Sequence, residues 1–298
     1  MSSPSTGGSA EASNDVSGNS AFVLVHGAWH NGATWDDLVP ELAARGHLSV
    51  TLDLPGAGEN AAVPASFHQR PLDPAAFATE PSPNAGVTQD SRSDAVIAAV
   101  ELAAQQGNGE VVLVGHSLGG LTISPVAEAI PDRLKAVVYI TAFLLPNDMA
   151  GGEIIGHEIN AAAEVPPLFM ADPEQVGALR MDVASPDPDY RAAVKSAFYA
   201  DLTDQQFADA VAKLHCDEPA QVAGVPSNIT AGRFGTVDRH YVRCADDRAI
   251  LAATQDLMVT KVDEQLGSTT TVHNMNASHS PFYSDPAGLA DILASIAG

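Results

Sequence analysis

Short apolar runs and segments of helical periodicity alternate along most of the chain. The first run, Ala21–His26, begins with five consecutive apolar residues and is short enough for a strand buried in a parallel sheet. Between Trp35 and Ala43, apolar residues recur at three- and four-residue spacing, which predicts a helix that ends at Gly46. Leu48–Leu54 is then predicted to be a second strand.

The same alternation extends to residue 141. The pattern predicts, in chain order, a helix from Asp90 to Gly107, a strand over Val111–Val114, a helix over Leu118–Ile130 and a strand over Ala136–Thr141. Repeated strand-then-helix order implies a mostly parallel sheet that is flanked by helices on both faces. The sequence therefore predicts an α/β fold.

Residues 145–225 interrupt this alternation. They contain helical patterns, among them Tyr190–Tyr199 and Asp204–His215, but no convincing strand. We therefore expect an inserted helical cap over residues 145–225. The α/β core would then comprise residues 21–144 and 226–298.

The core pattern resumes after the expected cap. A strand is predicted near Asn228–Ala231 or Tyr241–Cys244, followed by a helix near Ile250–Val259, a strand over Thr270–Met275 and a final helix from Pro286. A second interruption, residues 55–89, is predicted to be a long loop. Its prolines are expected to prevent regular structure, namely Pro64, Pro71, Pro74, Pro81 and Pro83.

The charge of the chain narrows the choice of partners. The sequence has 37 acidic residues against 14 Lys and Arg, a net charge of −23, and the acids are scattered. Nucleic acid is excluded as a partner because binding a polyanion needs a basic face. No apolar stretch is long enough to cross a bilayer, so no membrane partner is expected. Cys216 and Cys244 lie far apart and fit neither a disulfide framework nor a zinc site.

The N-terminal segment, residues 1–20, differs from the rest in composition. It consists mainly of Ser, Gly, Ala and Asn, without the basic start and apolar centre of a secretory signal. We expect a disordered tail. Cytoplasmic localisation is the default expectation for such a sequence.

The motif Gly-x-Ser-x-Gly is present at residues 115–119, between a predicted strand and a predicted helix. This context is typical of a nucleophile elbow, in which a sharp turn holds the serine in a strained conformation. Gly115 and Gly119 leave room for that turn. Ser117 would lie at a helix N-terminus, where the dipole favours a developing anion. We predict that Ser117 is a nucleophile.

A serine nucleophile needs a base, and ten histidines compete for that role. In this architecture the base lies between the last strand and the last helix, which selects His279. His273 is predicted to pack within the last strand. His116 lies inside the elbow, and His26 and His30 flank the first loop, so these three are expected to have structural roles.

The imidazole in turn needs a carboxylate to fix its tautomer. The chain order serine, acid, histidine points to the turn after Tyr241–Cys244, which contains Asp246 and Asp247. Asp247 is preferred because hydrolases of this type commonly place the acid three residues beyond the strand. Asp148 is a third candidate.

Attack on a carbonyl creates an oxyanion that needs two hydrogen-bond donors. One is expected to be the backbone amide of Leu118, directly after the nucleophile. The other is assigned to the amide of Ala28, in the loop after the first strand, because Gly27 lets that backbone approach closely.

Taken together, these segments resemble the family of plant hydroxynitrile lyases and methyl esterases, with its bacterial carboxylesterase members. The matching segments are Phe22–His30, Val114–Gly120, Tyr241–Ile250 and Ser278–Phe282 with Asp285 and Pro286. The resemblance covers most of residues 21–298. It implies the α/β-hydrolase fold with a sheet of about six to eight strands, a helical cap over the serine, and no cofactor.

Within this family the lyases differ at two positions. They tend to carry threonine where this chain has Gly27, and lysine where it has Ser280. A cation there would hold the departing cyanide, so its absence favours ester hydrolysis. The resemblance thus implies a carboxylesterase that acts on a small neutral ester through an acyl-enzyme. The alternatives are a hydroxynitrile lyase-type carbon–carbon lyase, a cofactor-free oxygenase with the same His-Asp pair, or a ligand receptor with residual hydrolase activity.

Overall fold

The computed structural model describes residues 19–298. Six strands form one sheet in the order β2-β1-β3-β4-β7-β8, and every pairing between them is parallel. They are β1 (Ala21–Val25), β2 (Ser49–Thr51), β3 (Val111–His116), β4 (Leu134–Ile140), β7 (Asp238–Cys244) and β8 (Thr271–Met275). The predicted α/β fold is therefore confirmed, although β2 is shorter than predicted.

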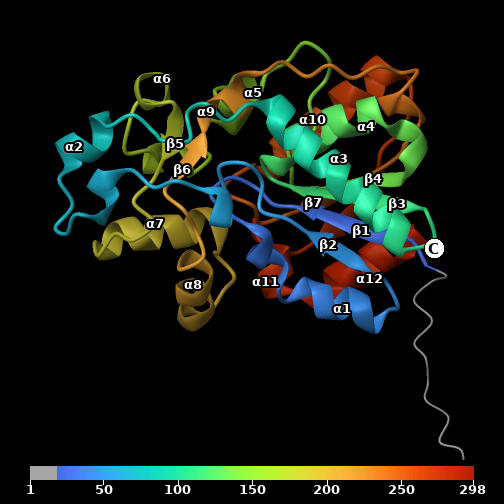
Figure 1. Ribbon diagram of the computed structural model, residues 1–298, viewed down its shortest axis with the longest axis horizontal. Helices are drawn as coiled ribbons and strands as arrows, with labels where there is room; N and C mark the ends of the chain where they lie inside the picture. Colours follow the sequence, from blue (N-terminus) through green and yellow to red (C-terminus); the bar gives the residue numbers. More distant parts are fainter. Residues whose placement is uncertain (1–18) are drawn as a thin grey trace, which may run out of the picture.

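Helices cover both faces of this sheet (Figure 1). One face carries α3 (Gln89–Gln106), α4 (Gly119–Ala129) and α10 (Ala252–Leu266), and the other carries α1 (Leu38–Ala44) and α12 (Pro286–Ala297). Successive residues of a strand point to opposite faces, so Phe22 belongs to one buried apolar cluster and Val23 to the other. This two-sided burial explains why the strands are continuous apolar runs.

The strand order brings two distant loops together. β1 and β3 are paired neighbours, with Val25 opposite Gly115, although the chain forms β2 between them. The connections after β1 and β3 therefore run to opposite sides of the sheet. Their first residues meet at the carboxyl edge, the usual position of a ligand crevice in such sheets.

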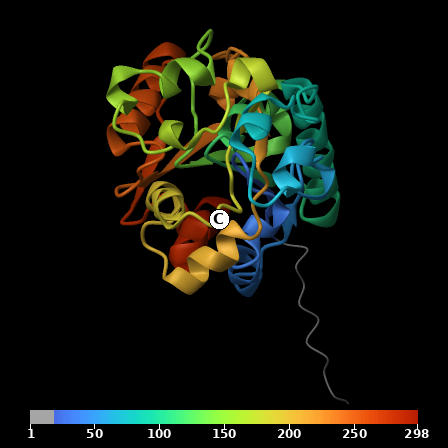
Figure 2. The same cartoon turned by 90° about the vertical axis from the view of Figure 1, so that its left-hand side faces the viewer.

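Residues 145–225, called the cap segment below, form a lobe beside the carboxyl edge, which Figure 2 views end-on. Its helices are α5 (Gly151–Ile155), α6 (Pro173–Val176), α7 (Pro188–Phe198), α8 (Asp204–Val211) and α9 (Ala220–Gly224). It also contains an antiparallel pair, β5 (Ala178–Arg180) with β6 (Asp217–Pro219). The expectation of no strand in this segment is therefore wrong. Three residues are too few to display an alternating pattern.

Residues 55–89 are more regular than expected. Within them α2 (Pro74–Thr79) is a helix, so the expectation that the prolines prevent regular structure is wrong there. Proline at the first helical position lacks only an amide that would have no helical partner. Asp73 caps this helix by accepting hydrogen bonds from the amides of Ala75 and Ala76.

Three further expectations concern single segments. Of the two strands considered after the cap segment, the one at Tyr241–Cys244 exists as part of β7, whereas residues 228–231 form no strand. The predicted tail lies, up to residue 18, outside the described residues. Within residues 19–298, no helix is long and apolar enough to cross a membrane.

Candidate active site

Ser117 occupies the sharp turn between β3 and α4. Its φ angle is 51°, a left-handed value that is rare for residues other than glycine. The turn packs tightly against the first loop, since a β-carbon at Gly119 would lie 2.6 Å from the carbonyl oxygen of His26. The motif thus folds as a strained elbow, as its sequence predicted.

His279 lies after β8 and contacts a carboxylate. Its Nδ1 is 2.7 Å from Oδ2 of Asp247, and both side chains are buried. Because a carboxylate can only accept, Nδ1 donates this bond and Nε2 of the neutral ring is left as an acceptor. Of the competing acids, Asp246 and Asp148 are exposed.

Backbone and side-chain donors hold the Asp247 carboxylate in place. Its Oδ1 accepts hydrogen bonds from the amides of Ala249, at 2.7 Å, and Ile250, at 3.0 Å. The hydroxyl of Thr141 donates to Oδ2. Thr141 was missed by sequence reasoning, although its position at the end of a predicted strand is where such a residue could be sought. These donors stabilise the charged form of a buried carboxylate.

His116, which precedes Ser117 in the chain, contacts His279. Nε2 of His116 is 2.8 Å from the carbonyl oxygen of His279, and the two rings lie 4.6 Å apart. Within residues 19–298, no hydrogen bond is formed by the hydroxyl of Ser117. Such bonds often tighten only when substrate is bound.

The cap segment contacts the loop that carries His279, because Asp201 accepts from the amide of Ser278 at 2.8 Å.

The residues of the two predicted oxyanion donors line a pocket. Ala28 and Leu118 line it together with Ser117. Neither of their amides donates to any acceptor among the described residues. Two free amides beside a nucleophile are the arrangement that can stabilise an oxyanion.

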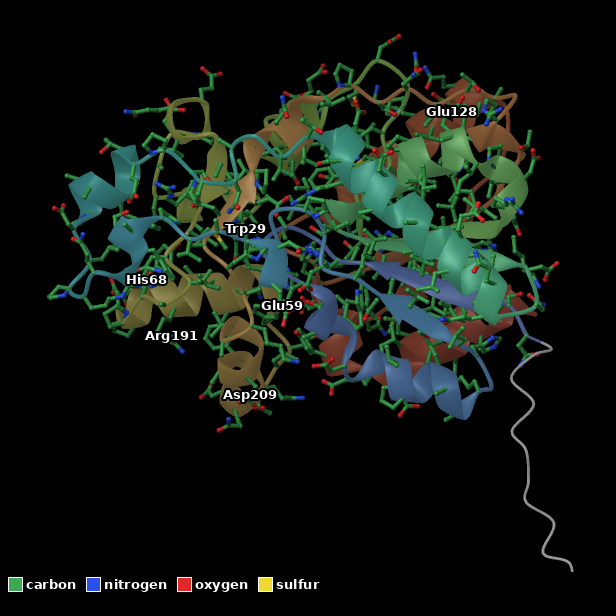
Figure 3. All side chains as sticks on the ribbon, viewed as in Figure 1. Trp29, Glu59, His68, Glu128, Arg191 and Asp209 are labelled. Atoms are coloured by element: carbon green, nitrogen blue, oxygen red, sulfur yellow. The ribbon has the colours of Figure 1, made fainter. Side chains whose placement is uncertain are left out.

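The conformation of the first loop depends on a carboxylate from the cap segment. Trp29, at the junction of the two lobes in Figure 3, has a φ of 60° and donates its amide to Oε2 of Glu218 at 3.2 Å. Oε1 of Glu218 is 2.5 Å from Arg92 on α3. Burial opposes the charge, but Arg92 and His215 lower the pKa of Glu218 to about 2. Sequence reasoning missed this pair because no local pattern connects residues 92 and 218.

Two buried histidines also shape this loop. Nδ1 of His26 donates to the carbonyl of Gly27 at 2.8 Å, and its Nε2 accepts from the amide of Leu54. Nδ1 of His30 donates to the carbonyl of Ala28 at 2.7 Å, and its Nε2 accepts from the hydroxyl of Tyr199. Burial lowers the pKa of His26 to about 4 and that of His30 to about 3. At neutral pH both rings are therefore uncharged, and their hydrogen bonds hold the backbone of the first loop.

The pocket is small and mainly apolar. Its volume is about 40 Å³, and Trp29, Phe143, Phe169 and Phe198 contribute aromatic rings to its wall. Its only polar side chains come from Ser117 and Asn160. A more open groove of about 810 Å³ adjoins it and shares Ile155, Phe169 and Leu179. Small neutral groups fit such a pocket best.

The two positions that distinguish the lyases are closely packed. A β-carbon at Gly27 would lie 2.8 Å from Cβ of Ser117 and 2.9 Å from Nδ1 of His116, so a larger residue requires a shift of the backbone. Ser280 is fully buried, and its hydroxyl has no hydrogen-bond partner in the described part of the chain.

The described residues form no cluster of metal ligands. Within residues 19–298, no group of three or more His, Cys, Asp or Glu side chains is arranged to hold a metal ion. Cys216 and Cys244 are both buried and free.

Comparison with known proteins places this geometry in a family. The profile described as the alpha/beta hydrolase family matches residues 22–292. A pyrethroid hydrolase of Sphingobium wenxiniae is 26% identical, with 93% of this chain and 87% of the relative covered. Salicylic acid-binding protein 2 of Nicotiana tabacum is also 26% identical, over 93% of this chain and 96% of its own.

A solved structure has the same fold. The crystal structure of a pyrethroid hydrolase from Sphingobium faniae superposes with a TM-score of 0.72 at 24% identity, covering 93% of this chain and 97% of the other. Methylesterase 2 of Arabidopsis thaliana, 26% identical over 93% of this chain and 95% of its own, adds a plant esterase. The predicted resemblance to plant methyl esterases and their bacterial relatives is confirmed, and the chain belongs to the alpha/beta hydrolase family.

Proposed function

We propose that this protein is a carboxylesterase that hydrolyses small neutral esters, with Ser117 as nucleophile, His279 as base and Asp247 as its carboxylate partner. The observation that carries the proposal is the buried His279–Asp247 hydrogen bond of 2.7 Å, beside a serine in a strained elbow. The names of its relatives, a pyrethroid hydrolase and a methylesterase, support an ester-hydrolysing activity.

The reaction follows from the positions of these groups. Ser117 Oγ attacks the carbonyl carbon and gives its proton to Nε2 of His279, while Asp247 stays ionised. The amides of Ala28 and Leu118 donate to the oxyanion. Collapse of this intermediate expels the alcohol, which takes its proton from His279. Water then attacks the acyl carbon and gives a proton to the same imidazole. Collapse of this second intermediate breaks the bond to Ser117 Oγ, which takes the proton back from His279 as the acid is released.

The pocket favours an uncharged substrate. No Lys or Arg is among its lining residues, and the whole chain carries a net charge of −23. An anion would lose its hydration without meeting a cation, which is costly in an apolar site. The same argument disfavours carbon–carbon lyase chemistry, in which cyanide leaves as an anion.

The test is a screen of neutral esters and mandelonitrile. We expect turnover of p-nitrophenyl or methyl esters above about one per second on a good substrate, with little cyanide release above the buffer rate. A fluorophosphonate that inactivates the enzyme should label Ser117, as peptide mass mapping would reveal. Faster cleavage of mandelonitrile than of every ester would replace the esterase by a lyase. Binding without turnover would favour a receptor.

A further inference from the structure

Asn160 is a buried amide in the wall of an otherwise apolar pocket. It ends the short 3-10 turn Glu158–Asn160 of the cap segment, and its exposed fraction is 4%. Ser117 is the other polar side chain in the pocket lining. Asn160 therefore contributes from the cap segment to the same space into which the nucleophile opens.

One hydrogen bond, to the oxygen of the Asn160 side chain, orients this amide. The hydroxyl of Thr254 donates to Oδ1 of Asn160 at 3.1 Å, and Thr254 is itself fully buried in the first turns of α10. The oxygen of the amide thus has a partner. Among the described residues, none accepts a hydrogen bond from Nδ2. Nδ2 is not among the buried polar atoms without a partner, so it is accessible at the surface of the pocket. A group that displaces water from the pocket binds better when it accepts from Nδ2, because otherwise this donor loses its access to water.

We propose that Asn160 is a specificity-determining residue whose Nδ2 donates to a second acceptor oxygen of the substrate, in addition to the scissile ester. This inference rests on the proposed esterase function. The substrate class is then a neutral ester that carries an ether or carbonyl oxygen in the part that fills the pocket. A substrate carboxylate is disfavoured, because no cation lines this pocket.

The chemistry of the pocket explains how one amide can select. In an apolar pocket, contact alone favours a methylene group over an ether oxygen, because the oxygen loses its hydration. An oxygen near Nδ2 keeps this donor paired when the substrate covers it, whereas a methylene leaves it without an acceptor. Asn160 should therefore discriminate between two esters that differ only in the replacement of one methylene by oxygen. Such esters have almost the same shape.

The test uses substrate pairs that differ by this exchange. On the acyl side, p-nitrophenyl methoxyacetate is compared with p-nitrophenyl butyrate, and on the alcohol side methoxyethyl acetate is compared with butyl acetate. Each ratio of kcat/KM is divided by the corresponding ratio for hydroxide, which removes the intrinsic reactivity. We expect the wild-type enzyme to prefer the ether by about tenfold in one of the two pairs.

Three variants identify the group responsible. Asn160→Leu, of similar volume, should abolish the preference, and Asn160→Asp should reverse it, because a carboxylate repels an acceptor oxygen. Thr254→Val should reduce the preference to a smaller extent by freeing the amide. Val165→Ala is the matched control, because it enlarges the same pocket and should change both members of a pair by a similar factor. Thermal unfolding shows whether each variant is folded.

The possible outcomes separate this inference from the proposed function. No preference in either pair, or a preference that survives both Asn160→Leu and Asn160→Asp, overturns the role of Asn160 and leaves the esterase intact. The first of these results would mean that water satisfies Nδ2. Failure to hydrolyse any of the four esters would instead overturn the esterase on which the inference rests.

Discussion

The strand-end loops of the sheet and the cap segment line the same pocket, but they contribute different types of residue to it. The loops contribute Ala28, Ser117 and Leu118, each within a few positions of a strand end. The cap segment contributes an apolar wall and Asn160, and its structure depends on buried charges. The candidate catalytic groups are thus specified by local sequence, whereas the shape of the pocket depends on residue pairs that are distant in sequence.

Two ion pairs of the cap segment are buried on both sides. Arg180 on β5 contacts Asp217 on β6 through two bonds of 2.7 Å. The same guanidinium donates to the carbonyls of Phe77 and Glu80, which joins residues 55–89 to the cap segment. The second pair, Arg92 with Glu218, joins the cap segment to α3. Nη2 of Arg92 has no hydrogen-bond partner among the described residues, whereas every nitrogen of the Arg180 guanidinium donates a hydrogen bond. Buried pairs of this kind fix one arrangement more than they add stability.

The largest expected effect concerns the loops. Ser117→Ala and His279→Ala should each lower kcat/KM for a good ester by at least about ten-thousandfold, because nucleophile and base act as one unit. Matched controls are Ser280→Ala, whose hydroxyl has no partner among the described residues, and His273→Ala on the outer strand β8. A folded Ser117→Ala protein that keeps its activity would refute the assignment.

The next effect separates two adjacent acids. Asp247→Asn should lower kcat by about a thousandfold, because an amide that donates to Nδ1 selects the wrong imidazole tautomer. Asp246→Asn should have little effect, since Asp246 is exposed and its neighbour makes the bond to His279. Steady-state rates for both variants on one ester decide the matter. Equal losses would show that the turn as a whole matters rather than the Asp247 carboxylate.

The strand-end loops could be predicted from the sequence more fully than the cap segment. Ser117, His279 and the free amides were predictable because a strand end and a short motif specify their positions. Asp247 required a choice, since Asp246 is its neighbour, and only the path of the turn buries one and exposes the other. The strands β5 and β6 were missed because each is short and carries a charged residue, Arg180 or Asp217, of a type that is usually found at the surface. Asn160 has no sequence signal, since its role depends on Thr254.

A smaller effect tests the link between the cap segment and the loops. Glu218→Gln should lower the free energy of unfolding by about 3 kcal/mol, because it leaves the buried Arg92 without a counter-charge. It should also lower kcat, since the amide of Trp29 loses a charged acceptor beside Ala28. The double variant Glu218→Gln with Arg92→Met should recover most of the stability but not the rate.

Urea unfolding and ester kinetics on the same preparations make this comparison. Asp204→Asn serves as a control, because it breaks an ion pair with Lys195 in which Asp204 is fully exposed, and we expect little change. If Glu218→Gln destabilises the protein without any change of rate, then the carboxylate stabilises the lobe but does not position the first loop.

The smallest expected effect is the change in the free energy of unfolding per pH unit that the buried histidines of the first loop cause. The pKa of His26 is lowered to about 4 and that of His30 to about 3, in both cases mainly by burial. In the unfolded chain both titrate near pH 6.5. Below that pH the unfolded state binds protons that the native state excludes, so stability falls as the pH falls. The fall should be about 1.4 kcal/mol per pH unit for each histidine. It ends for His26 near pH 4 and for His30 near pH 3.

Urea unfolding between about pH 7 and pH 5 measures this slope. His30→Gln removes one titrating group and should reduce the slope below about pH 6 by about 1.4 kcal/mol per pH unit, even though the loss of its ring lowers stability at every pH. His68→Gln is the matched control, because the His68 side chain is exposed, as Figure 3 shows. His116, buried in the elbow with a pKa lowered well below its usual value, adds to the same slope. An unchanged slope in His30→Gln would mean that His30 is protonated in the native state, in which case its Nε2 could not accept from Tyr199 and the first loop would be held differently.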